Sequence, residues 1–180
     1  MNIDYKILSD AIVYYQAKGF IYEDVSWVVS EYISNITKPE ISKNLPIFNG
    51  VLVASAEQSF LQKIYDDKLQ KGSYVALTPC FRDDVVDYLH QQYFMKVELI
   101  ETLDTTKSRL NDIISICQNF FNQYVNTEIE MTGNLTYDII DSKTKTELGS
   151  YGIRNHSIGS WIYATGVAEP RLSRVIKLNS

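Results

Sequence analysis

Two strand-like segments separated by a polar stretch constrain the fold more than any other feature of this sequence. Residues 74–82 and 93–102 are rich in β-branched and aromatic side chains, whereas residues 83–92 between them are polar and acidic. We therefore expect the two segments to pair as a hairpin with an unusually long tip. A single arginine, Arg82, would then lie at the mouth of the hairpin.

The second of these strands has two chemically different faces. Side chains alternate between the faces of a strand, so every second residue points the same way. One face is apolar, is expected in the core, and consists of Tyr93, Met95 and Val97. The other face mixes an aromatic ring, a cation and an anion, and consists of Phe94, Lys96 and Glu98. Such a mixture suits the floor of a binding site better than an open surface.

The remaining sequence predicts a few helices between further strands. Apolar residues at helical spacing predict helices over residues 4–17, 57–69 and 106–124, and a last helix from residue 170 onward. Gly19 is expected to cap the first helix. Further strands are predicted over residues 50–54, 137–141, 147–154 and 160–166. The predicted class is α+β, an antiparallel sheet flanked by helices.

Two neighbouring segments near the N-terminus are harder to interpret. Residues 20–34 fit either a strand followed by a short helix or one irregular strand. Residues 34–49 contain Pro39 and Pro46 with several polar residues, and they predict a long loop that orders over a ligand.

Composition limits the class of protein. The 180 residues suffice for one domain with a real core, and 45% hydrophobic residues with 13 tyrosines indicate a folded, soluble chain. No apolar run approaches the roughly 20 residues that a membrane-spanning helix needs, and no leader is recognisable, so a cytoplasmic location is expected. Cys80 and Cys117 lack metal-site spacing and are expected to be reduced, packed thiols. The net charge of −5 argues against a broad basic surface for nucleic acid.

The hairpin segment resembles a known motif. The residues FRDD at 81–84 precede a variable loop, then His90, then Phe94 four residues later and Glu98 four beyond that. This order is similar to motif 2 of the class II aminoacyl-tRNA synthetases. The one departure within the motif is Asp84, where the family usually has glutamate.

Three other stretches resemble that family in the same order. SAEQ at 55–58 resembles a loop that contacts the substrate amino group, and ELGSYGIR at 147–154 resembles a strand that supplies a magnesium ligand. Residues 163–176 resemble motif 3, with Arg171 in the place of its arginine. Residues 18–27 look like a degraded motif 1, with Ser26 about where its proline stands, which puts the family's usual dimer interface in doubt. The likeness spans residues 18–176, most of the chain.

The resemblance implies that an amino acid, or a similar small carboxylate, is activated by ATP as an acyl-adenylate, with Mg²⁺ as cofactor and pyrophosphate as product. Arg82 and Arg171 would be catalytic, with Arg82 clamping the α-phosphate and Arg171 sandwiching adenine against the Phe94 ring. The implied ATP-binding set is Arg82, Asp84, His90, Phe94 and Arg171. The implied amino-acid-binding set is Ser55, Glu57, Gln58 and Ser150, with Glu57 meeting an ammonium group. Glu98 and Glu147 would hold the metal.

Each residue also has a structural alternative. Arg82 could pair with Asp83 or Asp84 on the surface, and His90 could be a solvated loop residue. Arg171 could belong to a solvated helix face, although cations are disfavoured at a helix N-terminus. Phe94 alone would more often be a core residue. For His156, Lys38 and Arg154, a surface position is the preferred interpretation.

Three hypotheses follow for the whole chain, which is expected to be one catalytic domain over residues 1–180 without an anticodon-binding domain. In the first, it is an AMP-forming ligase that passes the acyl group to the acceptor end of a tRNA, a protein or a small molecule, and a homodimer is one assembly it could form. In the second, it is a non-catalytic synthetase paralogue that binds ATP or an amino acid and regulates a partner. In the third, only the fold is shared, and the chain is a structural or interaction module.

Overall fold

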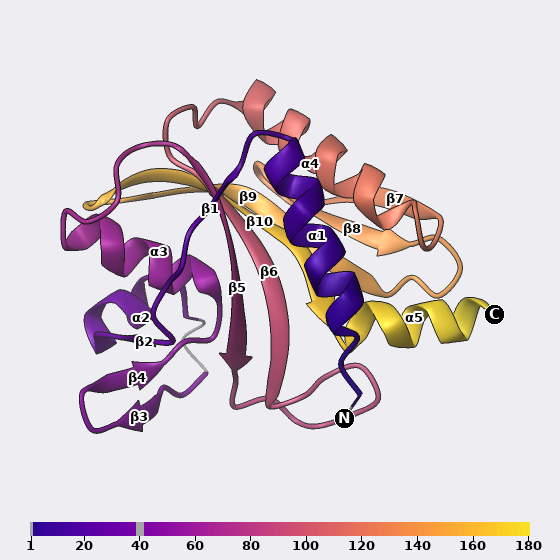
Figure 1. Cartoon of the computed structure of the whole chain (residues 1–180), viewed down its shortest axis with the longest axis horizontal. Helices are drawn as coiled ribbons and strands as arrows, with labels where there is room; N and C mark the ends of the chain where they lie inside the picture. Colours follow the sequence, from indigo (N-terminus) through magenta and orange to yellow (C-terminus); the bar gives the residue numbers. More distant parts are fainter. Residues whose placement is uncertain (1, 39–41) are drawn as a thin grey trace.

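A computed structural model describes residues 2–38 and 42–180 (Figure 1). Its centre is a large sheet with the strand order β1-β5-β6-β10-β9-β8-β7. All neighbouring strands in it are antiparallel except β1 and β5. The strands are β1 Ile21–Tyr22, β5 Ser73–Phe81, β6 Tyr93–Glu101, β7 Thr127–Gly133, β8 Thr136–Asp141, β9 Glu147–His156 and β10 Gly159–Glu169. The predicted α+β class is confirmed.

Helices cover both faces of this sheet. Helices α1 (Tyr5–Ala17) and α4 (Lys107–Phe121) lie together across one face, where they bury the larger apolar cluster (Figure 1). Helix α3 (Ala56–Tyr65) packs on the other face with α2 (Glu31–Thr37). A small sheet lies beside α2 and α3, with the strand order β2 (Val28–Val29), β4 (Gly50–Leu52), β3 (Leu45–Ile47). Helix α5 (Arg171–Asn179) is the last element.

The first helix shows how local sequence fixes the element boundaries. The side chain of Asp4 accepts hydrogen bonds from the backbone N–H groups of Lys6 and Ile7, as an N-cap residue does. At the other end, Gly19 has φ +94° and its N–H donates to the carbonyl of Gln16 at 3.0 Å. Glycine adopts this left-handed conformation without steric cost, so the predicted cap is confirmed.

Several predicted boundaries are wrong. Residues 20–34 form two short strands before a helix, and the expected loop over 34–49 contains the end of α2 and β3 (Leu45–Ile47), which pairs with β4 (Gly50–Leu52). Pro39 lies outside the described residues. Helix α3 ends four residues before the predicted limit of residue 69. Strand β7 was not predicted at all.

The hairpin of β5 and β6 is confirmed, and its register positions the site. Phe94 pairs with Cys80, and Lys96 with Thr78, so the mixed face of β6 lies against the inner part of β5. Val97 is fully buried on the opposite face, as expected, but Tyr93 is 57% exposed and does not belong to the core. Tyr93 is the first residue of β6, directly after the polar tip of the hairpin.

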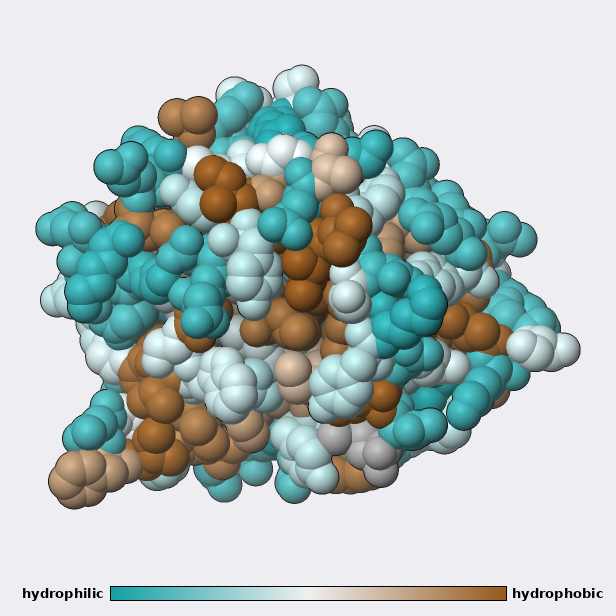
Figure 2. Space-filling model, viewed as in Figure 1, coloured by the Kyte–Doolittle hydropathy of each residue, from teal (hydrophilic) through white to brown (hydrophobic). Residues whose placement is uncertain are grey.

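The space-filling view shows apolar side chains exposed between polar ones on the face of the molecule that is turned to the viewer in Figure 1 (Figure 2).

Both cysteines are free and buried, as predicted. Within the parts of the chain that the structure describes, no helix is both long and apolar enough to cross a bilayer.

Candidate active site

Two adjoining cavities open on the mixed face of the β5–β6 hairpin. They contain about 490 Å³ and about 970 Å³ of empty space, part of it open to solvent, which lies within the usual range for small-molecule sites. Four residues line both cavities, namely Arg82, Asp84, Lys96 and Thr165. A ligand in one cavity would therefore meet a ligand in the other along this shared wall.

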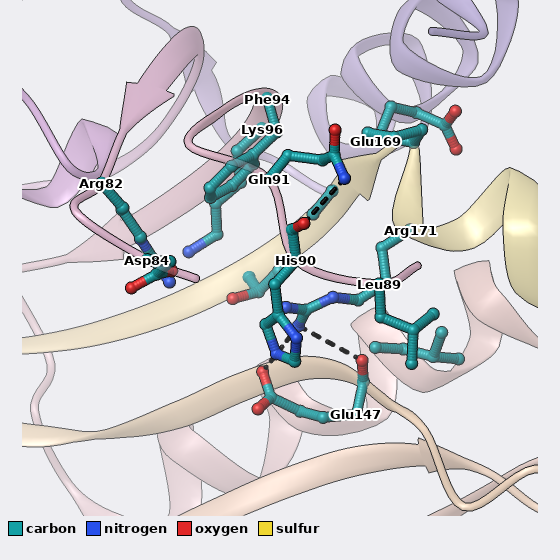
Figure 3. A pocket seen from close by; sticks show the side chains of 14 residues that line it. Arg82, Asp84, Leu89, His90, Gln91, Phe94, Lys96, Glu147, Glu169 and Arg171 are labelled. Atoms are coloured by element: carbon teal, nitrogen blue, oxygen red, sulfur yellow. Dashed lines mark hydrogen bonds and ion pairs between the residues drawn. The ribbon is translucent and has the colours of Figure 1, made fainter. Parts of the chain in front are cut away.

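The first cavity, which we call the nucleotide cavity after the role predicted for its residues, gathers residues that the sequence spreads over 90 positions. Its walls include the whole predicted ATP-binding set and one of the two predicted metal ligands, Glu147 (Figure 3). These side chains come from the hairpin strands, the loop between them, the start of β9 and the start of α5. The backbone thus brings together residues that no local periodicity connects.

Arg82 is held at the mouth of the hairpin. Its N–H donates to the carbonyl of Gln92 at 2.8 Å, which closes the hairpin loop, and its Nε donates to the carbonyl of Ala54 at 3.3 Å. The guanidinium carbon lies 5.1 Å from the centre of the Phe94 ring, a cation–π distance. Arg82 is therefore oriented by the backbone of a neighbouring segment and by the ring on its partner strand.

The hairpin loop is ordered by residues that the sequence did not single out. Asp87 Oδ2 lies 2.8 Å from Nδ1 of His90, and Asp87 Oδ1 accepts the backbone N–H groups of Leu89 and His90 at 2.7 and 2.6 Å. These hydrogen bonds, led by the one from the His90 ring, lower the pKa of Asp87 to about 2. From α5, Arg174 donates to the carbonyl of Tyr88 and stacks on its ring at 5.3 Å.

Arg171 has a carboxylate partner. It is the first residue of α5, and its Nη1 lies 3.3 Å from both the carbonyl and the Oε1 of Glu147. The side chain of Glu147 is 49% exposed on the cavity wall. A cation at a helix N-terminus is opposed by the helix dipole, and Glu147 offsets that cost here.

The second cavity, which we call the acyl cavity after the role predicted for its residues, is lined by all four residues of the predicted amino-acid-binding set and by Glu98. Glu57 is 6% exposed, and its Oε1 accepts a hydrogen bond from Trp161 Nε1 at 2.6 Å. The same oxygen lies 3.4 Å from Nε of Arg154. Burial raises the pKa of Glu57, and the positive charge of Arg154 opposes that rise.

The predicted surface position of Arg154 is wrong. A surface position was preferred for it, but it lines the acyl cavity, pairs with Glu57 and stacks over the Tyr163 ring at 4.5 Å. Its partners lie on α3 and β10, so the sequence carried no local signal for this role. Lys38, which also lacked an assignment, lines the same cavity.

Gln58 is held by the protein itself. Its side-chain oxygen accepts the backbone N–H of Ala54 at 2.8 Å, and its nitrogen donates to the carbonyl and hydroxyl of Ser34 at 3.2 and 3.3 Å. It therefore ties the turn before α3 to α2. Ser150 also lies on the cavity wall, and its backbone N–H donates to Thr165 Oγ1 at 3.3 Å.

Glu98 has both carboxylate oxygens engaged. Its Oε1 accepts a hydrogen bond from Nζ of Lys96 at 2.6 Å, and its Oε2 accepts the backbone N–H of Ala56, at the start of α3. This arrangement fits Glu98 poorly as a metal ligand. Among the described residues, no group of three or more His, Cys, Asp or Glu side chains could hold a metal ion.

The fold matches that of the catalytic domains of class II aminoacyl-tRNA synthetases, as the motifs predicted. Among solved structures, a pyrrolysyl-tRNA synthetase from Desulfitobacterium hafniense superposes with a TM-score of 0.74 at 12% identity, over 96% of this chain and 68% of that one. A cytoplasmic serine-tRNA ligase from Naegleria fowleri, in complex with AMP, superposes with a TM-score of 0.70 at 14% identity, over 93% of this chain and 52% of that one.

These likenesses establish the fold alone. No protein-family model matches the sequence, and no curated protein matches it. The chain spans about two thirds of the length of the first of these structures and about half of the second.

Proposed function

We propose that this chain uses ATP to activate the carboxylate of an amino acid, forming an acyl-adenylate and releasing pyrophosphate. The observation that carries the proposal is the pair of cavities with a shared wall at Arg82. The predicted nucleotide residues line one cavity, and the predicted amino-acid residues line the other. A carboxylate in the acyl cavity and an α-phosphate in the nucleotide cavity would meet at that wall.

In the nucleotide cavity, Phe94 would stack on adenine, and Arg171 would contribute a cation–π contact. Arg82 already contacts the Phe94 ring, so adenine would take the remaining surface of the ring while Arg82 reaches the α-phosphate. A guanidinium fork can hold two phosphate oxygens at once and stays charged. His90, hydrogen-bonded to Asp87, would be directed toward the outer phosphates.

The chemical step needs little from the protein beyond placement and charge. One oxygen of the substrate carboxylate attacks the α-phosphorus, the bond from that phosphorus to the bridging oxygen breaks, and pyrophosphate leaves with the electron pair. Holding both reactants along one wall supplies the proximity on which this displacement depends. Arg82, on the shared wall, would offset the negative charge that builds up on the α-phosphoryl oxygens.

Of the two predicted magnesium ligands, Glu147 fits that role and Glu98 does not. Mg²⁺ in nucleotide sites is commonly held by one or two carboxylates plus substrate phosphates, and Glu147 offers a half-exposed carboxylate on the cavity wall. Glu98 is engaged on both oxygens, and we assign it no metal. When bound, the ion would neutralise phosphate charge, and Glu147 would release Arg171 toward the nucleotide.

In the acyl cavity, Glu57 would meet the ammonium group of the substrate. One of its oxygens already serves Trp161 and Arg154, but a carboxylate has about four acceptor positions. Most of the residues that line this cavity are polar or charged, which suits a polar amino acid. The acceptor of the activated acyl group could be the end of a tRNA, a protein or a small molecule.

The alternative is a non-catalytic paralogue that binds ATP or an amino acid and regulates a partner. The observation that favours it is the self-contained bonding of Gln58 and Glu98, which leaves the acyl cavity with fewer free polar groups than a set of substrate ligands would have. In that case nucleotide binding would occur without turnover.

The deciding experiment is exchange of labelled pyrophosphate into ATP, with Mg²⁺ and each of the twenty amino acids in turn. Exchange that depends on one amino acid would establish adenylate formation and identify the substrate. Absence of exchange together with calorimetric binding of ATP would favour the regulatory paralogue. Absence of both would leave only the fold.

A further inference from the structure

Lys96 occupies the position where the two cavities meet, and none of the family-like motifs gave it a role. It lies on β6 midway between Phe94 and Glu98, and it is one of the four residues that line both cavities. Its side chain is 11% exposed. Figure 3 shows it extending into the cavity toward the same region as the head groups of Arg82 and Asp84.

Burying the charged Lys96 side chain costs free energy, which points to a role for this cation in binding or catalysis. Nζ is paired with Glu98 at 2.6 Å, and the Glu98 side chain is only 6% exposed. A buried ion pair loses the hydration of both groups, and replacing such a pair by apolar residues is often neutral or stabilising. Stability therefore gives little reason for a lysine on this wall, while the chemistry of two anionic reactants gives a direct one.

Glu98 also fixes where the ammonium group can lie. Its second oxygen accepts the backbone N–H of Ala56, so the carboxylate cannot turn without breaking a bond to the start of α3. An ammonium group has three N–H donors, and Glu98 Oε1 accepts one of them. Glu98 thus holds the ammonium group of Lys96 on one side, and the remaining N–H donors are on the side of the two cavities.

We propose that Lys96 is a catalytic residue, whose ammonium group contacts both the attacking carboxylate and the α-phosphate where the two cavities join. This proposal rests on the proposed function, because it needs the two reactants to meet at that wall. The carboxylate and the α-phosphoryl group repel each other, and a fixed cation between them offsets that repulsion as the new oxygen–phosphorus bond forms and pyrophosphate departs. Glu98 acts through Lys96 and is a positioning residue.

The first test is the Lys96→Met variant in pyrophosphate exchange with the amino acid that the wild-type protein accepts. Removing one fixed charge-stabilising donor typically lowers kcat about 100- to 1,000-fold, so we expect a loss of that size at saturating substrates. A small alkylammonium ion added to Lys96→Ala should restore part of the rate, which a purely structural role would not produce. Full activity of Lys96→Met would overturn the proposal, as would a loss of activity that parallels loss of the folded state.

The matched control is Lys63→Met. Lys63 also pairs with a glutamate, Glu23, in a partly buried setting, but neither lines either cavity. Its replacement should leave kcat within about twofold of wild type, because Lys63 lies outside both cavities and any loss of stability would not change the chemical step. Unfolding midpoints of both variants show whether folding is retained.

A second readout separates this proposal from the proposed function. If the wild-type protein shows no exchange with any amino acid, the enzymatic proposal fails, and calorimetric affinity for ATP then tests Lys96 alone. Lys96→Met should bind ATP about tenfold more weakly than wild type, whereas Lys63→Met should match it, because Lys96 would touch a phosphate and Lys63 would not. Equal affinity of wild type and Lys96→Met would overturn the contact, and absence of ATP binding by the wild type would overturn both proposals.

Discussion

The pair formed by Glu57 and Arg154 makes a pH-dependent contribution to stability that can be measured. Burial raises the pKa of Glu57 above its usual value of 4.5, and the charge of Arg154 is the main influence that opposes the rise. The folded protein therefore binds this proton more readily than the unfolded chain, so stability falls as the pH rises above 4.5. Arg154→Met would raise the pKa further and extend the fall to higher pH.

The size of the effect has an upper limit. The loss cannot exceed the cost of keeping the Glu57 carboxyl protonated, which is about 1.4 kcal/mol for each pH unit above 4.5. That limit is about 3.5 kcal/mol at pH 7 and about 0.7 kcal/mol at pH 5. For a chain of this size the larger value corresponds to a shift in Tm of about 7 to 14 °C. Loss of the stacking of Arg154 on Tyr163 adds a smaller term that does not vary with pH.

The assay is urea unfolding of wild type and Arg154→Met between pH 5 and pH 8, followed by tryptophan fluorescence. Trp161 is a suitable reporter because it is buried and donates its hydrogen bond to Glu57. The variant should lose stability mainly at the upper end of this range. The control compares the double variant Glu57→Gln/Arg154→Met with the single variant Glu57→Gln. The difference in stability between these two proteins should not depend on pH, because the amide does not titrate. A deficit of equal size at pH 5 and pH 8 in Arg154→Met would refute the reasoning.

Three other predictions concern the same face and the core. Arg82→Ala and Arg171→Ala should each abolish nucleotide turnover while the circular dichroism spectrum and unfolding midpoint stay close to wild type, and a variant with full activity would contradict the site assignment. Asp87→Asn should weaken the hydrogen bonds that hold His90, so limited proteolysis should cut the hairpin loop faster than in wild type, with unchanged cutting counting against the proposed role of Asp87. Burial raises the pKa of each cysteine to about 12, so iodoacetamide should modify neither in the native protein at pH 8 and both in urea, as mass spectrometry would show.

The elements that the sequence predicted correctly are those with a buried side. Helix α4 buries six apolar residues at regular helical spacing, and this periodicity is visible in the sequence alone. Strand β7 has no such signal, because it lies at the sheet edge and all but its first residue are exposed. Strand β3 was concealed by Pro46, which usually argues against a strand, but this strand lies at the edge of its small sheet, where proline is tolerated.

The candidate site also contains residues that could be assigned from the sequence and residues that could not. Residues of the hairpin motif could be assigned from the sequence because their spacing is fixed by the strands that carry them, and all of those assigned to ATP line one cavity. Their partners were not found because the contacts join distant segments. Trp161 lies 104 positions from Glu57, and Tyr88 lies 86 positions from Arg174. No periodicity relates such pairs, so only the folded chain reveals them.

Three cations on the walls of the two cavities are each paired with a glutamate. Arg171 pairs with Glu147, Lys96 with Glu98, and Arg154 with Glu57. A buried charge without a partner would be costly, so each pair lets the fold keep charges on an enclosed wall. A phosphate or carboxylate that binds one of these three cations must share or replace its glutamate, and the net gain in free energy is the difference between two contacts of similar kind. Affinity for any single charged group is then modest, and discrimination comes from a ligand that satisfies several pairs along the shared wall at once.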